Sequence, residues 1–287
     1  MTDGTDPGEA GWFVGVDPGD VDGATAAIMN ETATEPRSWP RLAVASGYAD
    51  SEREYYDRLH EVTMAATRSA VEAAERADDR QLVHAVRAMD DCTRTANELA
   101  ERVAEWAGTI DPDAETGIEY ARELAEREAD LPASGAPVRS LAGRVVELAD
   151  EAEGLRAFVE RQTPTVAPNL AALAGPVLAA RLISLVGGLE ELAKKPSGTV
   201  QVLGAEDALF AHLRGHAPSP KHGIIYTHDA VRGTHPDNRG SAARAVAGKL
   251  AIAARIDHYS GELNPDLEAE LADRIETIQA REVESNE

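Results

Sequence analysis

Residues 167–262 are APNLAALAGPVLAARLISLVGGLEELAKKPSGTVQVLGAEDALFAHLRGHAPSPKHGIIYTHDAVRGTHPDNRGSAARAVAGKLAIAARIDHYSGE, and this stretch decides the fold. It carries ten basic against eight acidic residues, a balance of +2 in a chain whose net charge is −23. An acidic chain that keeps one stretch free of excess negative charge is expected to bind an anion there. A better-buried domain with fewer surface charges would give the same balance.

The composition indicates a folded, mainly helical protein. The chain has 287 residues, of which 43% are hydrophobic and only 4% aromatic, enough for one large domain or two to three small ones. Its 51 acidic residues face 28 basic ones, nearly all of them Arg, which favours a cytosol of very high salt, as in a halophile. At molar salt the Debye length falls to roughly 3 Å, so such a surface does not repel itself apart.

The compartment is predicted from what the sequence lacks. Cys92 is the single cysteine, so no intrachain disulfide can form and a reducing compartment is expected. The N-terminal MTDGTDPGEAG has no basic or apolar signal region, and no apolar run approaches ~18 residues. A soluble, cytoplasmic protein without a membrane partner is expected.

The first 50 residues are predicted to hold an acidic leader (1–11) and a small α/β piece. Its strand candidates are Trp12–Val16, Leu42–Ala45 and, more weakly, Thr25–Met29. GVDPGDVDG at 15–23 offers carboxylates for a metal or a calcium loop, but the further ligands at fixed offsets are missing. A solvated turn is favoured there.

Residues 51–165 are predicted to form an antiparallel helical hairpin of coiled-coil type. Apolar residues recur at spacings of three and four between 82 and 106 and again between 141 and 159, with turn-rich sequence between the two runs. Self-association through this region is expected, although the pairing can be internal only. Cys92 falls on the seam and is interpreted as a core residue. The candidate dimerisation residues are Leu82, Met89, Leu99, Val103, Leu141, Val145, Leu148 and Leu155.

Residues 166–262 are predicted to form an all-helical domain, followed by a final helix and an acidic tail over 263–287. A helix starts at Pro168, another opens after Gly204, and a long Ala-rich helix spans 239–259. Gln201–Leu203 is expected to be extended. Asn264 and Pro265 begin the last helix. Arg255 is expected to pair with Asp257 or a neighbour, and Lys194 and Lys195 to lie on a solvated face.

Three long blocks of this stretch resemble the Nop domain. They are APNLAALAGPVLAARLISLVGGLEELAKKPSGTVQVLGAEDALF, SPKHGIIY and RGSAARAVAGKLAIAARID, in this order. The family is that of the archaeal core protein of box C/D small ribonucleoproteins, counterpart of the eukaryotic nucleolar Nop proteins. Tyr55-Tyr56 and Ala88-Met89-Asp90-Asp91 also resemble the start of the coiled-coil region of that family.

The resemblance implies a scaffold without a cofactor of its own, not an enzyme. Family members self-associate, bind a box C/D guide RNA together with a kink-turn-binding ribosomal-type protein, and hold the methyltransferase fibrillarin. Fibrillarin then methylates 2′-hydroxyls of ribosomal or transfer RNA. Carried onto this chain, the RNA-facing positions are Gly204, Ala205, Glu206, Arg214, Lys221, His222, Arg239 and Arg244.

Those positions have the chemistry that RNA binding needs. A helix N-terminus at Gly204 offers backbone amides to a phosphate, and Lys221 and His222 lie on a proline-stiffened loop. Arginine pairs bidentately with phosphate and stacks on bases. Asp207, Ala211 and Ser241 occupy positions where relatives commonly carry Lys or Arg. RNA affinity is therefore expected to depend less on salt than in those relatives.

Two departures concern the ends of the chain. The basic C-terminal tail of many relatives is missing, and the N-terminal region looks abbreviated, which puts the fibrillarin interface in question.

Two alternatives remain. A Nop-domain clamp on a kink-turn RNA needs no methyltransferase partner. A metal-dependent hydrolase would use the His-rich segment, where His212 and His216 are four residues apart, but no third ligand is placed to complete a zinc site. A Walker loop, a nucleophile elbow and a dinucleotide fingerprint are all absent from the sequence, so neither catalytic nor metal-binding residues are predicted.

Overall fold

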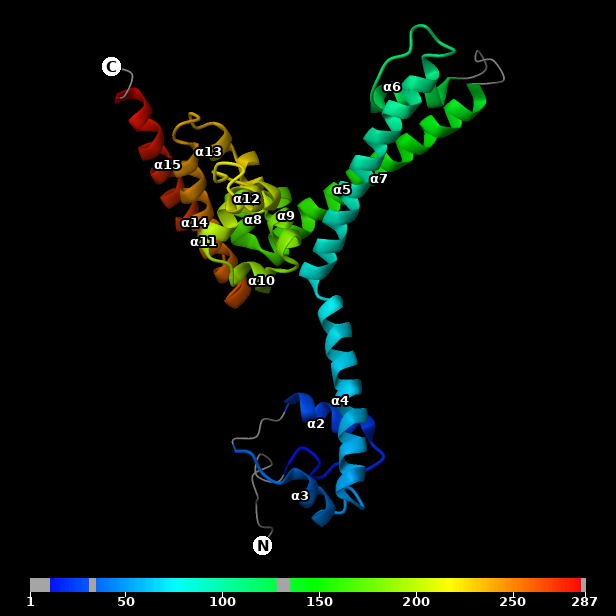
Figure 1. The fold of residues 1–287 in the computed structure, drawn as a ribbon, viewed down its shortest axis with the longest axis vertical. Coiled ribbons are helices and arrows are strands. Elements are labelled where there is room, and N and C mark those ends of the chain that lie inside the picture. Colours follow the sequence, from blue (N-terminus) through cyan, green and yellow to red (C-terminus); the bar gives the residue numbers. More distant parts are fainter. Residues whose placement is uncertain (1–10, 31–34, 128–134, 285–287) are drawn as a thin grey trace. The chain divides into compact units, whose positions relative to one another are not determined.

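A computed structural model describes residues 11–30, 35–127 and 135–284, and all regular elements in these ranges are helices (Figure 1). This confirms the mainly helical class. The chain divides into two compact units, Met1–Ala77 and Asp78–Glu287. The sequence placed boundaries at 50/51, 165/166 and 262/263; those domain limits stay predictions, and the division by contacts falls at 77/78.

The N-terminal unit is built on α4 (Glu52–Glu75), against which α2 (Val21–Asn30) and α3 (Trp39–Ala45) pack. The Ser51 hydroxyl accepts a hydrogen bond from Glu54 N at 3.2 Å, and the Glu54 carboxylate accepts one from Asp50 N at 2.8 Å. This reciprocal arrangement resembles a capping box and fixes where α4 begins. The aromatic residues Phe13, Tyr48 and Tyr55 form its small core.

The three strand predictions, and with them the small α/β piece, are wrong. Residues 12–15 form turns, 25–29 lie inside α2, and 42–45 lie inside α3. Apolar runs of four or five residues do not distinguish strand from helix, and the capping residues decide instead. The Asp20 carboxylate accepts a hydrogen bond from Gly23 N at 2.9 Å and begins α2. Of the turn predicted at 15–23, residues 15–20 lie before α2 and 21–23 lie inside it. The predicted acidic leader lies, except for Gly11, outside the described residues.

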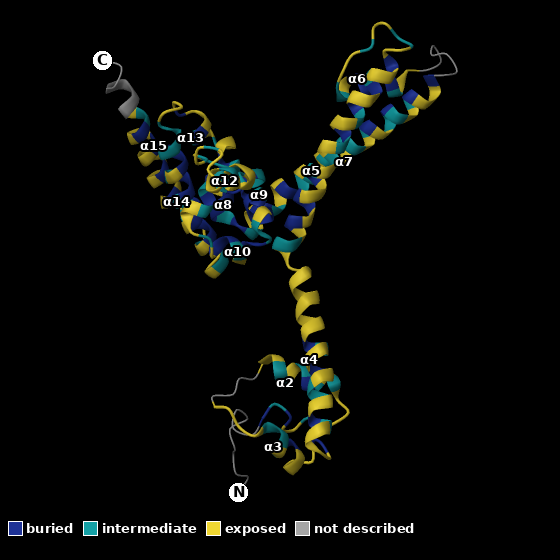
Figure 2. Ribbon diagram, viewed as in Figure 1, coloured by how far each residue is buried: buried dark blue, intermediate teal, exposed yellow. Residues whose placement is uncertain are grey.

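The second unit begins with the helical hairpin. Helices α5 (Asp78–Ala107) and α7 (Ala136–Val166) pair along their length, and α6 (Ile118–Glu126) packs beside α7 (Figure 1). Their buried residues follow the facing sides of the two long helices (Figure 2). The hairpin predicted from the heptad spacing is confirmed. A separate small core closes the far end of the hairpin; it includes Val103, Tyr120, Leu124, Val138 and Val145.

Most of the remaining helices pack against α14 (Arg239–Tyr259), whose small side chains allow close packing. Ala242, Ala243, Ala247 and Ala254 are all almost fully buried on it. The helices of this Nop-like region are α8 (Pro168–Ala174), α9 (Pro176–Val186), α10 (Leu189–Ala193), α11 (Ser197–Val202), α12 (Glu206–Leu213), η2 (Ile224–Thr227), α13 (Asp229–Arg232) and α15 (Asp266–Glu284). One continuous core runs from the base of the hairpin to α15.

Two sequence expectations in this region need correction. Gln201 and Val202 are the last residues of α11 rather than an extended piece, and Leu203 begins the turn that follows the helix. Asp257 does not pair with Arg255, which instead donates to Lys195 O at 3.2 Å. Lys194 forms solvent-exposed pairs with Glu190 and Glu191, as expected of a solvated face.

Asp257 joins α14 to the start of α8. It is 6% exposed, and its carboxylate accepts hydrogen bonds from Asn169 N, Asn169 Nδ2 and Leu170 N at 2.7 to 2.9 Å. Asn169 Oδ1 in turn accepts a hydrogen bond from Asn264 N at 2.7 Å. A buried carboxylate at a helix N-terminus is stabilised by the amides and by the helix dipole. This network therefore holds α8, α14 and the loop before α15 in one arrangement.

No single helix in the described ranges is long and apolar enough to cross a membrane. The pair α8 and α9 passes that test of length and composition only together, and it is bent by 119°.

Candidate functional site

The loop before η2 is fixed to the end of α11 by its backbone. Gly223 N donates to Gln201 O at 2.8 Å, and Ile224 N donates to Leu203 O at 2.7 Å. A Cβ added at Gly223 would lie 1.9 Å from Leu203 O, so no other residue fits here without a backbone shift. The Gln201 side chain adds a hydrogen bond of 2.7 Å to Lys221 O. The loop therefore presents Lys221 and His222 from a rigid support.

Four side chains from this loop, η2 and α14 form what we call the cation–aromatic cluster: Lys221, His222, Tyr226 and Arg239. The His222 and Tyr226 rings stack with centroids 4.8 Å apart and an angle of 23° between planes. The Arg239 guanidinium lies over the Tyr226 ring, 5.5 Å from its centroid, and Arg239 Nε donates to Thr234 O at 2.9 Å. The Lys221 stem lies 3.9 Å from where Gly240 would carry a Cβ.

The cation–aromatic cluster combines charged and neutral side chains. Burial first, and then the positive charges of Arg239 and Lys221, lower the pKa of His222 below its ordinary value of 6.5. His222 is therefore neutral at pH 7 and acts as an aromatic surface, while Lys221 and Arg239 carry the charge. A flat neutral ring flanked by two cations suits a nucleotide, which has an aromatic base and an anionic phosphate.

The Gly204 turn lies beside the loop. Gly204 has φ +80, and a Cβ there would lie 3.3 Å from Ile224 Cβ. The Glu206 carboxylate accepts a hydrogen bond from Gly204 N at 2.8 Å, so the glutamate stabilises its own turn rather than leaving that amide for a ligand. Ala205 precedes α12 and its N–H donates to Val202 O at 3.0 Å.

Helix α12 has no buried residue. Phe210 and Leu213 are 55% and 71% exposed, and Arg214 follows them at the C-terminal end. Sequence analysis singled out neither residue, because the sequence does not show whether an apolar side chain in a short helix is buried. They lie three residues apart in α12, so one side of this helix offers apolar area to solvent.

Arg244 is not brought to the cluster. It follows Arg239 by five residues, which turns it by about 140° around the helix axis. Its side chain is exposed and forms no ion pair within the described part of the chain. Lys249, in contrast, pairs with Glu270 of α15. Tyr226 belongs to the cluster although the sequence analysis did not single it out, since its role depends on the 3-10 turn at 224–227.

The histidines show no arrangement typical of a metal site. Within the described ranges no three His, Cys, Asp or Glu side chains are grouped to hold an ion. His212 Nδ1 lies 3.0 Å from Ala217 O, and His228 bridges Leu173 O and Ala230 N with its two ring nitrogens. Both histidines are engaged by the backbone.

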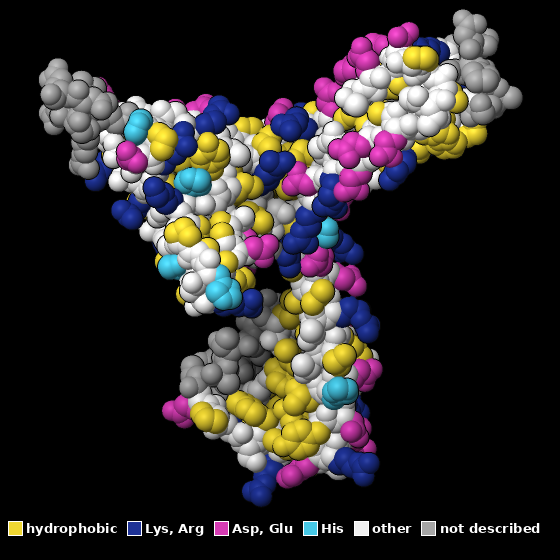
Figure 3. Space-filling view, turned by 45° about the horizontal axis from the view of Figure 1, so that its top comes forward, with side chains coloured by type: hydrophobic (Ala, Val, Ile, Leu, Met, Phe, Trp, Pro, Cys, Tyr) yellow, Lys and Arg dark blue, Asp and Glu magenta, His cyan; other side chains and the backbone are white. Residues whose placement is uncertain are grey.

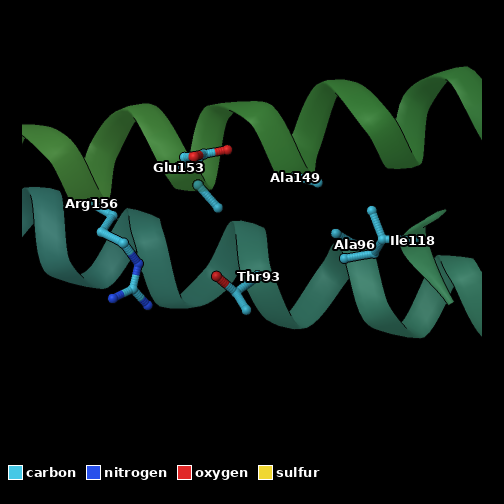
Figure 4. Close-up of a pocket in the computed structure, with 7 residues that line it drawn as sticks. Thr93, Ala96, Ile118, Ala149, Glu153 and Arg156 are labelled. Carbon is cyan, nitrogen blue, oxygen red and sulfur yellow. The ribbon is translucent and has the colours of Figure 1, made fainter. Parts of the chain in front are cut away.

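Seven of the eight candidate dimerisation residues are buried or pack against the cores of the second unit, and Leu148 is half-buried and belongs to neither core. Leu82, Met89, Val103 and Val145 are at most 1% exposed, and Leu99, Leu141 and Leu155 pack partly against the cores. Self-association stays a prediction, and these buried side chains stabilise the hairpin itself. Small residues on both helices leave a cavity of about 270 Å³ in the seam, lined by Thr93, Ala96, Ala149 and Arg156 among others (Figure 4).

Charge separates the two parts of the second unit. Asp and Glu side chains gather along the hairpin, whereas Lys, Arg and His side chains are spread over the Nop-like region (Figure 3). This agrees with the balance of +2 counted over residues 167–262. An RNA backbone would therefore be attracted to the region that holds the cation–aromatic cluster.

The amino-acid sequence is similar to those of a known protein family. The Nop family, described as "snoRNA binding domain, fibrillarin", matches residues 78–277. The chain is 33% identical over 271 residues to a NOP5 family protein of Methanocaldococcus jannaschii, covering 82% of this chain and 66% of that protein. It is 33% identical over 218 residues to nucleolar protein 58 of Schizosaccharomyces pombe, covering 63% and 43%.

A solved structure shares the fold. The chain resembles one in the crystal structure of a fibrillarin/Nop5p complex, with a TM-score of 0.52, 25% identity, and coverage of 90% of this chain and 92% of that one. The chain spans between about two fifths and two thirds of the length of these curated relatives. Since the family match extends over well more than half of the chain, the protein belongs to the Nop family.

Proposed function

We propose that this protein is a non-catalytic scaffold of a box C/D ribonucleoprotein. It binds a guide RNA together with a kink-turn-binding protein and positions fibrillarin for 2′-O-methylation of ribosomal or transfer RNA. Membership of the Nop family supports the RNA-binding role. The similarity to a chain in the fibrillarin/Nop5p complex supports fibrillarin as the methyltransferase partner.

The cation–aromatic cluster is the observation that carries the RNA-binding role. Unpaired RNA bases are recognised by stacking on aromatic rings and on guanidinium planes, and the phosphates by Lys and Arg. Here the stacked His222 and Tyr226 rings supply the first surface, and Lys221 and Arg239 the charges, on elements that hydrogen bonds hold fixed. Little entropy is lost when such a site binds, because its side chains are already ordered.

The exposed side of α12 is the proposed contact for the kink-turn protein. Phe210 and Leu213 offer apolar area, and the small helix adjoins the Gly204 turn, one side of the proposed RNA surface. A protein seated there would cover this apolar area and touch the same RNA. The N-terminal unit is the proposed contact for fibrillarin, and the hairpin is the proposed contact for a second copy of the chain.

A binding titration tests the RNA role. The full chain is added to a fluorescent box C/D guide RNA preassembled with the kink-turn protein, and anisotropy gives the affinity. Arg239→Ala and His222→Ala are expected to weaken binding roughly tenfold each, the size of one lost stacking or charged contact. Arg274→Ala on α15 removes the same charge from an exposed position and serves as the control. Wild-type affinity in both cluster variants would disprove the assignment.

A further inference from the structure

The motif Ala88–Asp91 at the base of the hairpin has no part in the function proposed above, yet it lies beside a cavity. This cavity has a volume of about 470 Å³ and lies between α5, α9 and η2. Its lining residues are Val86, Arg87, Asp90, Asp91, Arg181, Ser184, Leu185 and Ile224. A nucleobase would fit within it with room to spare.

The apolar part of the lining adjoins the proposed RNA surface. Leu185 and Ile224 line the cavity and also lie under the Gly204 turn, 3.6 Å and 3.3 Å from where Gly204 would carry a Cβ. Ile224 directly follows Gly223 of the fixed loop that presents His222. A nucleotide strand that follows the Gly204 turn therefore passes the cavity, and Leu185, 46% exposed, offers it an apolar surface.

The polar part of the lining has unused hydrogen-bonding groups. Arg181 Nη2 donates to Asp90 Oδ1 at 2.5 Å, but Arg181 Nε is buried without an acceptor among the described residues. Arg87 is exposed and forms no ion pair within those residues, whereas Asp91 already pairs with Arg94. Two guanidinium groups with spare N–H donors thus lie near one carboxylate that can accept a further hydrogen bond.

We propose that the cavity binds an unpaired guanine base of the RNA. Guanine O6 and N7 would accept hydrogen bonds from the guanidinium groups of Arg87 and Arg181, a pairing typical of arginine and guanine. The amino group on C2 and the N1–H would donate to Asp90, and the ring would lie on Leu185 and Ile224. Guanine is the base that offers acceptors on one edge and donors on the adjoining edge, as this lining requires. The inference rests on the proposed RNA-binding function and adds base selectivity to it.

Cross-linking tests the position of the base. Guide RNA containing 6-thioguanosine is bound to the full chain with the kink-turn protein, irradiated and digested with trypsin, and the modified peptides are identified by mass spectrometry. We expect cross-links to the peptides 81–87, 88–94 or 182–194. Because the peptide 222–232 holds both His222 and the cavity residue Ile224, its cross-links are assigned to single residues by fragmentation. Cross-links confined to Lys221, His222 and Arg239 would overturn the guanine pocket while leaving the RNA-binding function intact. No RNA binding by the wild-type chain would contradict the proposed function instead.

Variants test the contribution of the pocket to affinity. Leu185→Trp fills the cavity, and Arg87→Ala removes an exposed guanidinium; each is expected to weaken RNA binding roughly tenfold. Arg102→Ala, about four turns further along α5, is the control, because Arg102 pairs with Glu105 and neither residue lines the cavity; it is expected to bind within about twofold of the wild type. Loss of affinity in Arg87→Ala but not in Leu185→Trp would show a surface charge effect and overturn the pocket.

Discussion

At the scale of single residues, His222 is distinguished by its neighbours. Its ring stacks on Tyr226, and two cations lie close enough to oppose its protonation. The resemblance to the family identified Lys221, His222 and Arg239, and the structure brings these three together. It also adds Tyr226, which no motif singled out. The sequence could not show which face of η2 this tyrosine occupies.

The charge of Arg239 contributes to the lowered pKa of His222, so Arg239→Gln is expected to raise that pKa toward 6.5. Burial, the larger cause, remains, so the pKa should not return fully to 6.5. The pKa of His222 is lower in the folded chain than in the unfolded chain. As pH falls from above 6.5, the unfolded chain therefore binds a proton at His222 before the folded chain does. Stability present above pH 6.5 is then lost toward lower pH. NMR titration of the His222 ring measures the pKa. Arg244→Gln is the control, and an equal shift in both variants would refute the assignment to Arg239.

Gly223 is predicted to be the least replaceable residue of the site. Gly223→Ala places a Cβ 1.9 Å from Leu203 O, so the loop must move, at a cost of about 1–3 kcal/mol in the free energy of unfolding. RNA affinity should fall with it, because the loop carries Lys221 and His222. Gly248→Ala in the interior of α14 meets nothing within 4 Å and is expected to be neutral or slightly stabilising. Chemical denaturation and anisotropy on both variants check this. An equal free energy of unfolding for Gly223→Ala and Gly248→Ala would contradict the close contact at Gly223.

At the scale of elements, the hairpin and the helical region were predictable and the N-terminal unit was not. The heptad spacing along α5 and α7 persists over many turns, so its period is unambiguous. The runs at 12–16, 25–29 and 42–45 are too short for that, and only the helix at 25–29 has a side-chain cap, Asp20, before it. The exposure of Phe210 and Leu213 also escaped prediction, since periodicity does not show whether a helix has a partner.

The junction of α8 and α14 depends on Asp257. In Asp257→Asn one carboxylate oxygen becomes an NH2 group, which cannot accept a hydrogen bond, so the backbone N–H of either Asn169 or Leu170 loses its acceptor. The free energy of unfolding is expected to fall by about 2 kcal/mol or more, the cost of a lost buried hydrogen bond to a charged group. Asp273→Asn on the exposed side of α15 makes the same change of charge and should stay within about 0.5 kcal/mol. Equal unfolding curves for the two variants would show that the network contributes nothing.

At the scale of the whole molecule, the number of cations that contact phosphates determines how RNA binding responds to salt. The chain carries −23 overall, and four of the cationic positions carried over from the family are candidates for phosphate contacts: Arg214, Lys221, Arg239 and Arg244. Each phosphate contact contributes a slope of about −0.7 to −0.9 in log affinity against log salt. Affinity in molar salt must then come mainly from stacking and hydrogen bonds.

We therefore predict a salt slope no steeper than about −4 for guide RNA binding. Asp207→Lys and Ser241→Lys introduce cations at positions where relatives commonly carry them, and each should steepen the slope by about one. Anisotropy titrations over a salt series measure this. A steep slope in the wild-type chain, or no change in the two variants, would contradict the account.

One measurement tests the central claim most directly: a pull-down of the tagged full chain in molar salt, with sequencing of the bound RNA and identification of the bound proteins. The account predicts box C/D guide RNAs together with fibrillarin and a kink-turn-binding protein, and loss of the RNA in the Arg239→Ala, His222→Ala double variant. Guide RNA without fibrillarin would restrict the function to a clamp on RNA. Recovery of no RNA by the wild-type chain would contradict the central claim.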